Sequence, residues 1–113
     1  MSVTRTISLP THSAFELIVG LAVLIGPFAL GFGPAGMVAG VALGAVLIGL
    51  ALAGSEDSLP LSAHQAFDLS LVAALAAGGL GLGIAGDPGA GLWLAAAGIL
   101  ELALVVLTRW RRV

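Results

Sequence analysis

Long apolar segments, separated by short polar or glycine- and proline-rich stretches, dominate the chain. Residues 17–53 form a run of 37 residues without a charged side chain. As a single helix this run would be about 55 Å long, whereas the hydrocarbon core of a bilayer is about 30 Å thick. The run therefore predicts two spans that fold back on each other at GFGPAG, residues 31–36, where three glycines and Pro34 break the helix.

The second half of the chain has the same layout. The polar segment GSEDSLPLS precedes a third apolar segment, and the tight turn GDPG precedes a fourth. We predict an all-α fold, a four-transmembrane-helix bundle made of two parallel helical-hairpin repeats. The predicted parts are a cytoplasmic segment 1–12, spans 13–32 and 35–53, a polar cytoplasmic loop 54–62, spans 63–85 and 90–107, and a basic cytoplasmic tail 108–113.

The composition excludes an ordinary soluble domain. Hydrophobic residues make up 59% of the 113-residue chain and charged residues only 9%, whereas a soluble domain is about one quarter charged. A chain this short leaves most of its residues near its surface, so that surface must face lipid. A soluble four-helix bundle would need a polar stripe along each helix, and the sequence has none.

Charge and residue types limit the partners. The chain has no cysteine and a net charge of −2, which excludes disulfides and thiolate metal ligands and leaves no basic field for nucleic acid. We expect as partners the lipid bilayer and either a second copy of the chain or another membrane protein. We expect no nucleic acid, and the sequence identifies no small-molecule substrate.

The arginines predict the orientation in the membrane. All four cationic side chains lie near the termini, whereas Asp87 is the one charge on the opposite side. By the positive-inside rule, the termini are cytoplasmic and the membrane is the bacterial inner membrane. We interpret Trp110 as an aromatic anchor at the interface. A cleaved signal peptide is disfavoured, because the first apolar run exceeds the usual 7–15 residues.

The two halves of the chain also match as an internal repeat. HSAFEL, residues 12–17, aligns with HQAFDL, residues 64–69, at an offset of 52, and the same offset pairs Gly31 with Gly83. Each repeat holds two spans, so both repeats enter the membrane in the same orientation. This predicts a parallel repeat, in contrast to the inverted repeats of many transporters.

The segment LIGPFALGF, residues 24–32, resembles the SPW-repeat family of small bacterial membrane proteins. The first span of that repeat ends in a Ser-Pro-Trp-like triplet followed by Leu-Gly-Phe. Here GPF, residues 26–28, stands in the triplet position, and LGF follows at residues 30–32. The second repeat departs from the pattern with GGL at residues 78–80. The resemblance implies a helical-hairpin membrane fold and no established activity.

Small residues predict how the spans pack. Gly36, Gly40 and Gly44 form a ridge on the second span, and Gly98 lies in the fourth. Small residues let helices approach closely in lipid, where burial of apolar surface drives no association. We expect packing within one bundle, with a seam between copies as the alternative. Pro27 predicts a kink in the first span, or alternatively a hinge.

Two His–carboxylate pairs begin the first and third spans. His12 precedes Glu16 by four residues, and His64 precedes Asp68 by four, which places each pair on one helix face. The simplest interpretation is two polar helix starts at the water interface, with each carboxylate near the positive end of the helix dipole.

Glu101 differs from these carboxylates. It lies eight residues before Arg109, about 12 Å deeper along the axis, and its counterpart in the first repeat is Leu47. A charge at the bilayer centre costs about 2.5–3.5 kcal/mol, so burial favours the neutral acid. Glu101 is either structural, as a hydrogen-bonding group between helices, or functional.

Two histidines and two carboxylates are acceptable zinc or di-metal ligands. However, the ferritin-like signature is Glu-x-x-His, whereas the order here is His-x-x-x-Glu/Asp. We therefore predict no metal, no haem or other cofactor, and no catalytic residue. The expected function is a structural or interaction role without enzymatic activity: a scaffold, an accessory subunit or a homo-oligomer. The alternative is a proton- or ion-conducting element that uses Glu101 with both His–carboxylate pairs.

Overall fold

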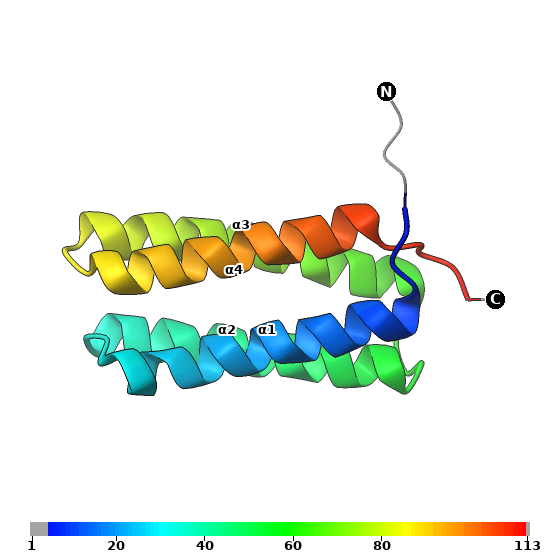
Figure 1. Cartoon of the computed structure of the whole chain (residues 1–113), viewed down its shortest axis with the longest axis horizontal. Helices are drawn as coiled ribbons and strands as arrows, with labels where there is room; N and C mark the ends of the chain where they lie inside the picture. The colour runs from blue at the N-terminus through cyan, green and yellow to red at the C-terminus, as the bar shows by residue number, and fades with distance from the viewer. Residues whose placement is uncertain (1–4, 113) are drawn as a thin grey trace, which may run out of the picture.

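A computed structural model describes residues 5–112 and contains four helices in two side-by-side hairpins (Figure 1). The helices are α1 (Leu9–Leu30), α2 (Pro34–Ser55), α3 (Leu61–Ile84) and α4 (Pro88–Leu107). Hairpin one pairs α1 with α2, and hairpin two pairs α3 with α4. The predicted all-α class and four-helix bundle are confirmed. Each of these helices is long and apolar enough to cross a membrane.

The ends of the helices are determined by local caps. The Ser8 hydroxyl accepts a hydrogen bond from the backbone N–H of Thr11, so α1 begins at Leu9 and not at the predicted residue 13. Gly31 ends α1 in the left-handed region, with φ of 68°. The loop predicted at 54–62 shortens to 56–60, because α2 extends to Ser55 and α3 begins at Leu61. His12 therefore lies inside a helix.

Glycines bring the helices of each hairpin into close contact. A Cβ on Gly44 would lie 2.6 Å from the backbone nitrogen of Leu24, and one on Gly79 would lie 2.8 Å from the carbonyl oxygen of Gly91. The predicted packing residues all lie in close contacts: Gly40 against Pro27, Gly44 against Leu24 and Gly98 against Leu75 within a hairpin, and Gly36 against Ala90 of the other hairpin. The ridge on α2 is thus buried within the chain and cannot also form a seam between copies.

The helix α1 continues through Pro27 without interruption. Proline removes the amide that would donate to the carbonyl of Val23, and that carbonyl lies against Gly40. One residue earlier, the carbonyl of Ala22 accepts a hydrogen bond from the indole Nε1–H of Trp93 at 3.0 Å. Contacts from α2 and α4 therefore meet α1 at the turn that Pro27 weakens.

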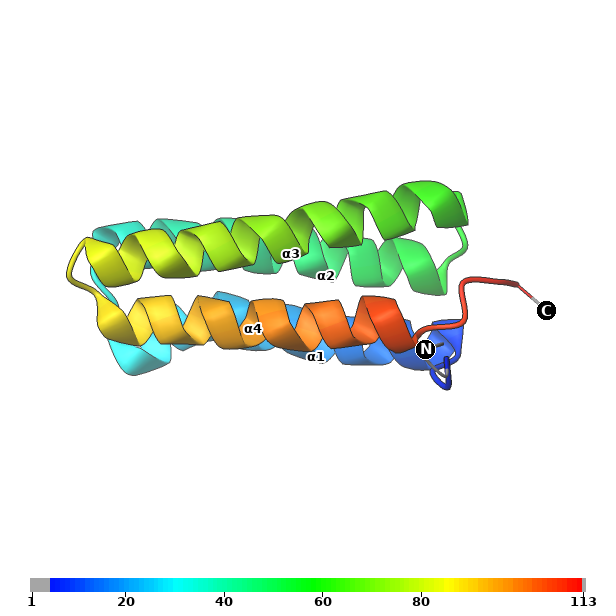
Figure 2. The ribbon, with the colours of Figure 1, turned by 90° about the horizontal axis from the view of Figure 1, so that it is seen from above.

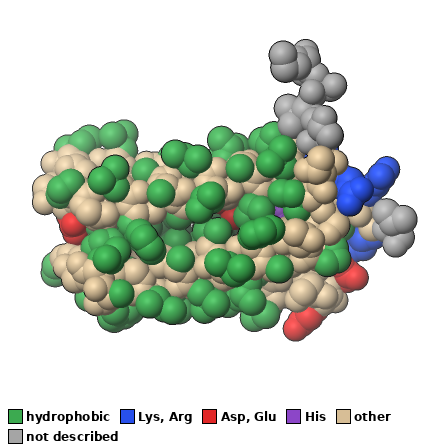
Figure 3. All heavy atoms as spheres, in the orientation of Figure 1, with side chains coloured by type: hydrophobic (Ala, Val, Ile, Leu, Met, Phe, Trp, Pro, Cys, Tyr) green, Lys and Arg blue, Asp and Glu red, His purple; other side chains and the backbone are tan. Residues whose placement is uncertain are grey.

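The outward faces of the bundle are apolar. Hydrophobic side chains cover the long side seen in Figure 3, and the basic side chains gather at one end. Examples of exposed residues are Ile18, Val38, Leu80 and Ile99, each at least 60% accessible. Leu47, Leu75 and Leu94 fill the interior. This distribution is that of a multi-pass membrane protein, whose surface faces acyl chains.

Both described ends of the chain lie at that same end of the bundle (Figures 1 and 2). The amide of Ile7 donates to the carbonyl of Leu107 at 3.0 Å, and the amide of Arg109 donates to the carbonyl of Ile7 at 2.8 Å. Thr108 is fully buried there, so the predicted tail 108–113 does not leave the bundle at once. Residues 1–4 of the predicted segment 1–12, and Val113, lie outside the described residues.

Candidate functional site

Five ionisable side chains meet in the interior near the end of the bundle that holds both termini. We call them the polar cluster. They come from three helices: His12 and Glu16 on α1, His64 and Asp68 on α3, and Glu101 on α4. All are 0–3% exposed. The prediction that the pairs form polar helix starts at the water interface is therefore wrong, because both helix starts turn these side chains into the core.

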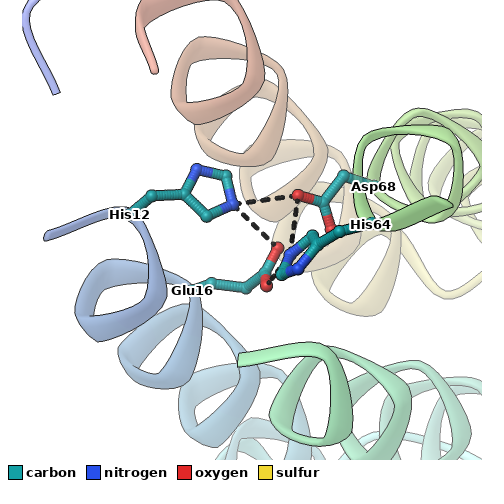
Figure 4. A group of neighbouring side chains, drawn as sticks. All are labelled: His12, Glu16, His64 and Asp68. Carbon is teal, nitrogen blue, oxygen red and sulfur yellow. Dashed lines mark hydrogen bonds and ion pairs between the residues drawn. The ribbon is translucent and has the colours of Figure 1, made fainter. Parts of the chain in front are cut away.

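Each histidine is closest to the carboxylate of the other hairpin (Figure 4). His12 Nε2 lies 2.9 Å from Asp68 Oδ2, and His64 Nε2 lies 3.1 Å from Glu16 Oε1. The distance from each histidine to the carboxylate of its own helix is longer: 3.5 Å from His12 to Glu16 and 3.3 Å from His64 to Asp68. Since α1 and α3 lie diagonally across the bundle (Figures 1 and 2), these contacts join the hairpins through the centre.

A hydroxyl determines the tautomer of His12. Thr108 Oγ1 donates its hydrogen to the carbonyl oxygen of Leu104 and lies 2.7 Å from His12 Nδ1. A carbonyl oxygen only accepts, and a hydroxyl has one hydrogen. Thr108 must therefore accept from His12, whose Nδ1 carries a proton. His12 Nε2 is left facing the carboxylates of Asp68 and Glu16.

Trp110 covers the cluster. Its indole lies 4.9 Å from the ring centre of His12, edge on, and 5.6 Å from that of His64. The indole Nε1–H donates to the carbonyl oxygen of Val105 at 2.9 Å, which holds the ring in place. The interpretation of Trp110 as an interfacial anchor missed this contact. The indole lies against both imidazoles, which are 1% and 3% exposed.

Glu101 completes the cluster and has no hydrogen-bond partner among the described residues. Both of its carboxyl oxygens are buried and accept no hydrogen bond from a described donor, and the same holds for Glu16 Oε2 and Asp68 Oδ1. Glu101 lies beside Glu16 and Asp68. Buried polar atoms without partners are rare and costly in folded proteins. The cluster thus presents four buried carboxyl oxygens without a conventional donor. Glu16 Oε2 has only the 3.5 Å ion pair with His12 Nε2, and a neutral Glu101 can donate its one proton to a single oxygen of Glu16 or Asp68.

A second polar link joins the hairpins at the opposite end. Asp87 caps α4 by accepting from the amide of Ala90 at 3.3 Å, and it also accepts from the amide of Gly33 in hairpin one at 3.1 Å. Sequence reasoning counted Asp87 only as a charge. The Asp-Pro order before a helix was the available signal for the cap, but the contact with Gly33 depends on the tertiary fold.

Comparison with known proteins finds no relative: no family model, no curated protein and no solved structure matches the chain. The resemblance of residues 24–32 to the SPW repeat stays a prediction.

The polar cluster combines two imidazoles with three carboxyl groups and excludes water. Such a group can store protons or bind a cation. The predicted candidates Glu101, Glu16, Asp68, His12 and His64 all meet there. Every buried polar or charged side chain of the described residues lies at this end of the bundle. The interior beyond it, around Val23, Leu47 and Leu94, is apolar.

Proposed function

We propose that this chain is a multi-pass protein of the bacterial inner membrane with a structural or interaction role and no catalysis of its own. It would act as a scaffold, as an accessory subunit or as a homo-oligomer. One observation carries the proposal: the polar cluster joins the hairpins at one end, and the described interior beyond it is apolar. Such a bundle presents an apolar surface to lipid or to another membrane protein, with no polar path across it.

The orientation that we propose has both termini and the polar cluster on the cytoplasmic side. The four arginines support it, since they all lie near the termini and the positive-inside rule places them in the cytoplasm. A parallel duplication of one hairpin is part of the same proposal. It is supported by contacts between the equivalent His–carboxylate pairs of the two hairpins. His12 lies against Asp68, and His64 lies against Glu16.

Membership of the SPW-repeat family is a further part of the proposal. It rests on GPF at residues 26–28 and LGF at residues 30–32. The proposal is supported by the position of this segment at the last turn of α1 and its cap at Gly31, since the family pattern ends a span.

Native mass spectrometry in mild detergent, combined with ion flux in proteoliposomes, tests the proposed role. We expect a complex of defined stoichiometry, with itself or with another membrane protein, and flux no higher than in empty liposomes. Glu101→Ala should change stability or assembly but not flux, and Glu56→Gln in the exposed loop is the matched control. A strictly monomeric chain in mild detergent would contradict the proposal.

A proton- or ion-conducting element is the second candidate. The observation that favours it is the position of Glu101 beside Glu16 and Asp68, which makes one continuous polar group. Conduction would still need a water wire, or a second copy, from this group to the turn at Asp87. Proton flux that exceeds the background and falls in Glu101→Gln would support this candidate, and flux unchanged by that substitution would exclude it.

A further inference from the structure

We propose that the polar cluster is a binding site for one divalent first-row transition-metal cation. The ligands are one nitrogen or oxygen atom from each of four side chains: His12, Glu16, His64 and Asp68. This inference goes beyond the proposed structural role, because it assigns a ligand to the cluster and reverses our expectation from sequence that the chain holds no metal.

The distances between neighbouring ligand atoms are close to those of a metal polyhedron. Four close pairs of 2.9, 3.1, 3.3 and 3.5 Å link His12 Nε2, Asp68 Oδ2, His64 Nε2 and the two oxygens of Glu16, since His64 meets Oε1 and His12 meets Oε2. One ligand atom from each of the four residues lies within 4.8 Å of the other three. A tetrahedral zinc ion with bonds of about 2.0–2.2 Å needs ligand atoms about 3.3–3.6 Å apart. The close pairs are therefore near the required separation, whereas the widest separation, at up to 4.8 Å, must close by up to about 1.2 Å.

Both helices supply their ligands at a spacing suited to a metal. Residues four apart lie on one helix face, as in the i, i+4 histidine pair of helical zinc sites. His12 with Glu16 and His64 with Asp68 have this spacing, and the helices α1 and α3 point the two pairs at one another (Figure 4). The ferritin-like order used in the sequence analysis is therefore only one of the arrangements that can hold a metal.

The contact between Thr108 and His12 is of the kind that orients a metal ligand. A ligating histidine almost always donates its other ring N–H to a fixed acceptor, which selects the tautomer. Here Thr108 accepts from Nδ1, so Nε2 is the nitrogen that faces the ring of carboxylates. Trp110 lies against both imidazoles, and the four ligand residues are 0–3% exposed.

The unpaired oxygens are an independent indication of a cation. Glu101 is 0% exposed, and neither of its carboxyl oxygens has a described partner, although it lies beside Glu16 and Asp68. The described histidines form ion pairs with Glu16 and Asp68 and none with Glu101, and the one proton of a neutral Glu101 satisfies only one neighbouring carboxylate oxygen. A divalent cation with two carboxylates and two neutral imidazoles makes a neutral group, which suits a low-dielectric interior. Glu101 can then approach the metal or a ligand oxygen.

The donor set selects the class of metal. Imidazole nitrogen suits zinc and the other transition metals, whereas magnesium and calcium prefer all-oxygen sites. The chain has no cysteine, so the site contains nitrogen and oxygen alone. Zn²⁺ is the appropriate probe.

The test is a metal-content measurement on the full chain in detergent, purified with an affinity tag that contains no histidine. After treatment with a chelator, the protein is incubated with excess Zn²⁺ and desalted, and zinc is measured by mass spectrometry against protein. We expect a zinc-to-chain ratio near one. A ratio at the background level overturns the proposal, whatever the variants do.

Variants locate the bound zinc. The double variant Glu16→Gln, Asp68→Asn keeps the size and polarity of the side chains but removes both anionic ligands, so its zinc ratio should fall to background. Asp57→Asn, an exposed aspartate at the same end of the bundle, is the matched control and should keep the wild-type ratio. Zinc at the wild-type ratio in the double variant would overturn the proposal, because the metal would then lie elsewhere.

Thr108→Val provides a graded readout that a folding defect does not imitate. Loss of a group that hydrogen-bonds to a metal ligand typically lowers metal affinity about 10- to 100-fold. We therefore expect the zinc affinity, measured by competition titration, to fall by a factor of that size. The helical content measured by circular dichroism should not change. Thr108→Ser should restore the affinity. Failure of zinc binding would leave the assembly and flux results of the proposed function unaffected, so the two hypotheses fail separately.

Discussion

At the scale of single residues, Thr108 shows how one buried hydroxyl organises the cluster. It is fully buried, accepts from His12 and donates to the carbonyl of Leu104. Thr108→Val keeps the volume but leaves the Nδ1–H of His12 without an acceptor. We expect a loss of about 1–3 kcal/mol in the unfolding free energy of the metal-free protein, measured by titration with a denaturing detergent. Thr108→Ser should lose much less, and equal losses in both variants would contradict the role given to the hydroxyl.

Asp87 permits a second prediction at this scale. Its carboxylate caps α4 and also accepts from Gly33 in the other hairpin. Loss of a helix N-cap costs about 0.5–2 kcal/mol, so Asp87→Ala should lower the unfolding free energy by about 1–2 kcal/mol. Asp57, whose partner Arg112 is also exposed, is the control. Asp57→Ala should stay within about 0.5 kcal/mol of the wild type.

The five ionisable members of the cluster could be chosen from the sequence, but their surroundings could not. Spacing of four residues identified His12 with Glu16, and burial cost identified Glu101. The pairing across hairpins depends on which helix faces lie inward, and the sequence leaves this open because every face is apolar. Thr108 and Trp110 join the cluster only because the tail pairs with Ile7, a tertiary contact without a local signal.

At the scale of helices, glycine positions control how closely the hairpins pack. A Cβ on Gly44 would lie 2.6 Å from the backbone nitrogen of Leu24, whereas one on Gly49 of the same helix would meet nothing within 4 Å. Gly44→Ala should therefore push α2 from α1 and destabilise the chain by about 1–3 kcal/mol. Gly49→Ala should be neutral or stabilising by up to about 1 kcal/mol, because alanine favours helix.

The two variants form a matched pair, since both add one methyl group to α2 and differ only in what that group meets. Comparison of their unfolding midpoints in detergent removes any effect of helix propensity. Equal midpoints for the two variants would show that Gly44 does not carry the close contact.

The sequence predicted the glycine ridge of α2 but could not resolve the glycines of α3. Gly36, Gly40 and Gly44 recur every four residues, which defines one face without further information. In α3, glycines at 78, 79, 81 and 83 lie on several faces. The structure packs Gly79 against Gly91 and leaves Gly81 with open space around it. The choice depends on the rotation of the helix about its axis, which apolar patterning does not determine when lipid and core are equally apolar.

At the scale of the whole molecule, the number of helices and their pairing follow from the thickness of the bilayer. A membrane span needs about 20 apolar residues, and the helices are 20–24 residues long, so breaks in hydropathy were sufficient to locate them. The helix ends in the structure differ from the predicted ends by up to four residues, because the caps at Ser8 and Asp87 act through hydrogen bonds that hydropathy does not record.

The orientation of the bundle can be tested with unusual directness, because the chain contains no cysteine and a single introduced cysteine is therefore the only thiol. Ser58 lies exposed in the loop between the hairpins, and Ala85 lies exposed at the end of α3, on the opposite side of the bundle. If the positive-inside rule governs insertion, a membrane-impermeant maleimide should label Ala85→Cys in spheroplasts and should label Ser58→Cys only after the membrane is opened. The reverse pattern would place the termini and the polar cluster outside the cell. The cluster would then meet the metal ions of the surroundings and not those of the cytoplasm, so this measurement also decides which compartment supplies the metal proposed for it.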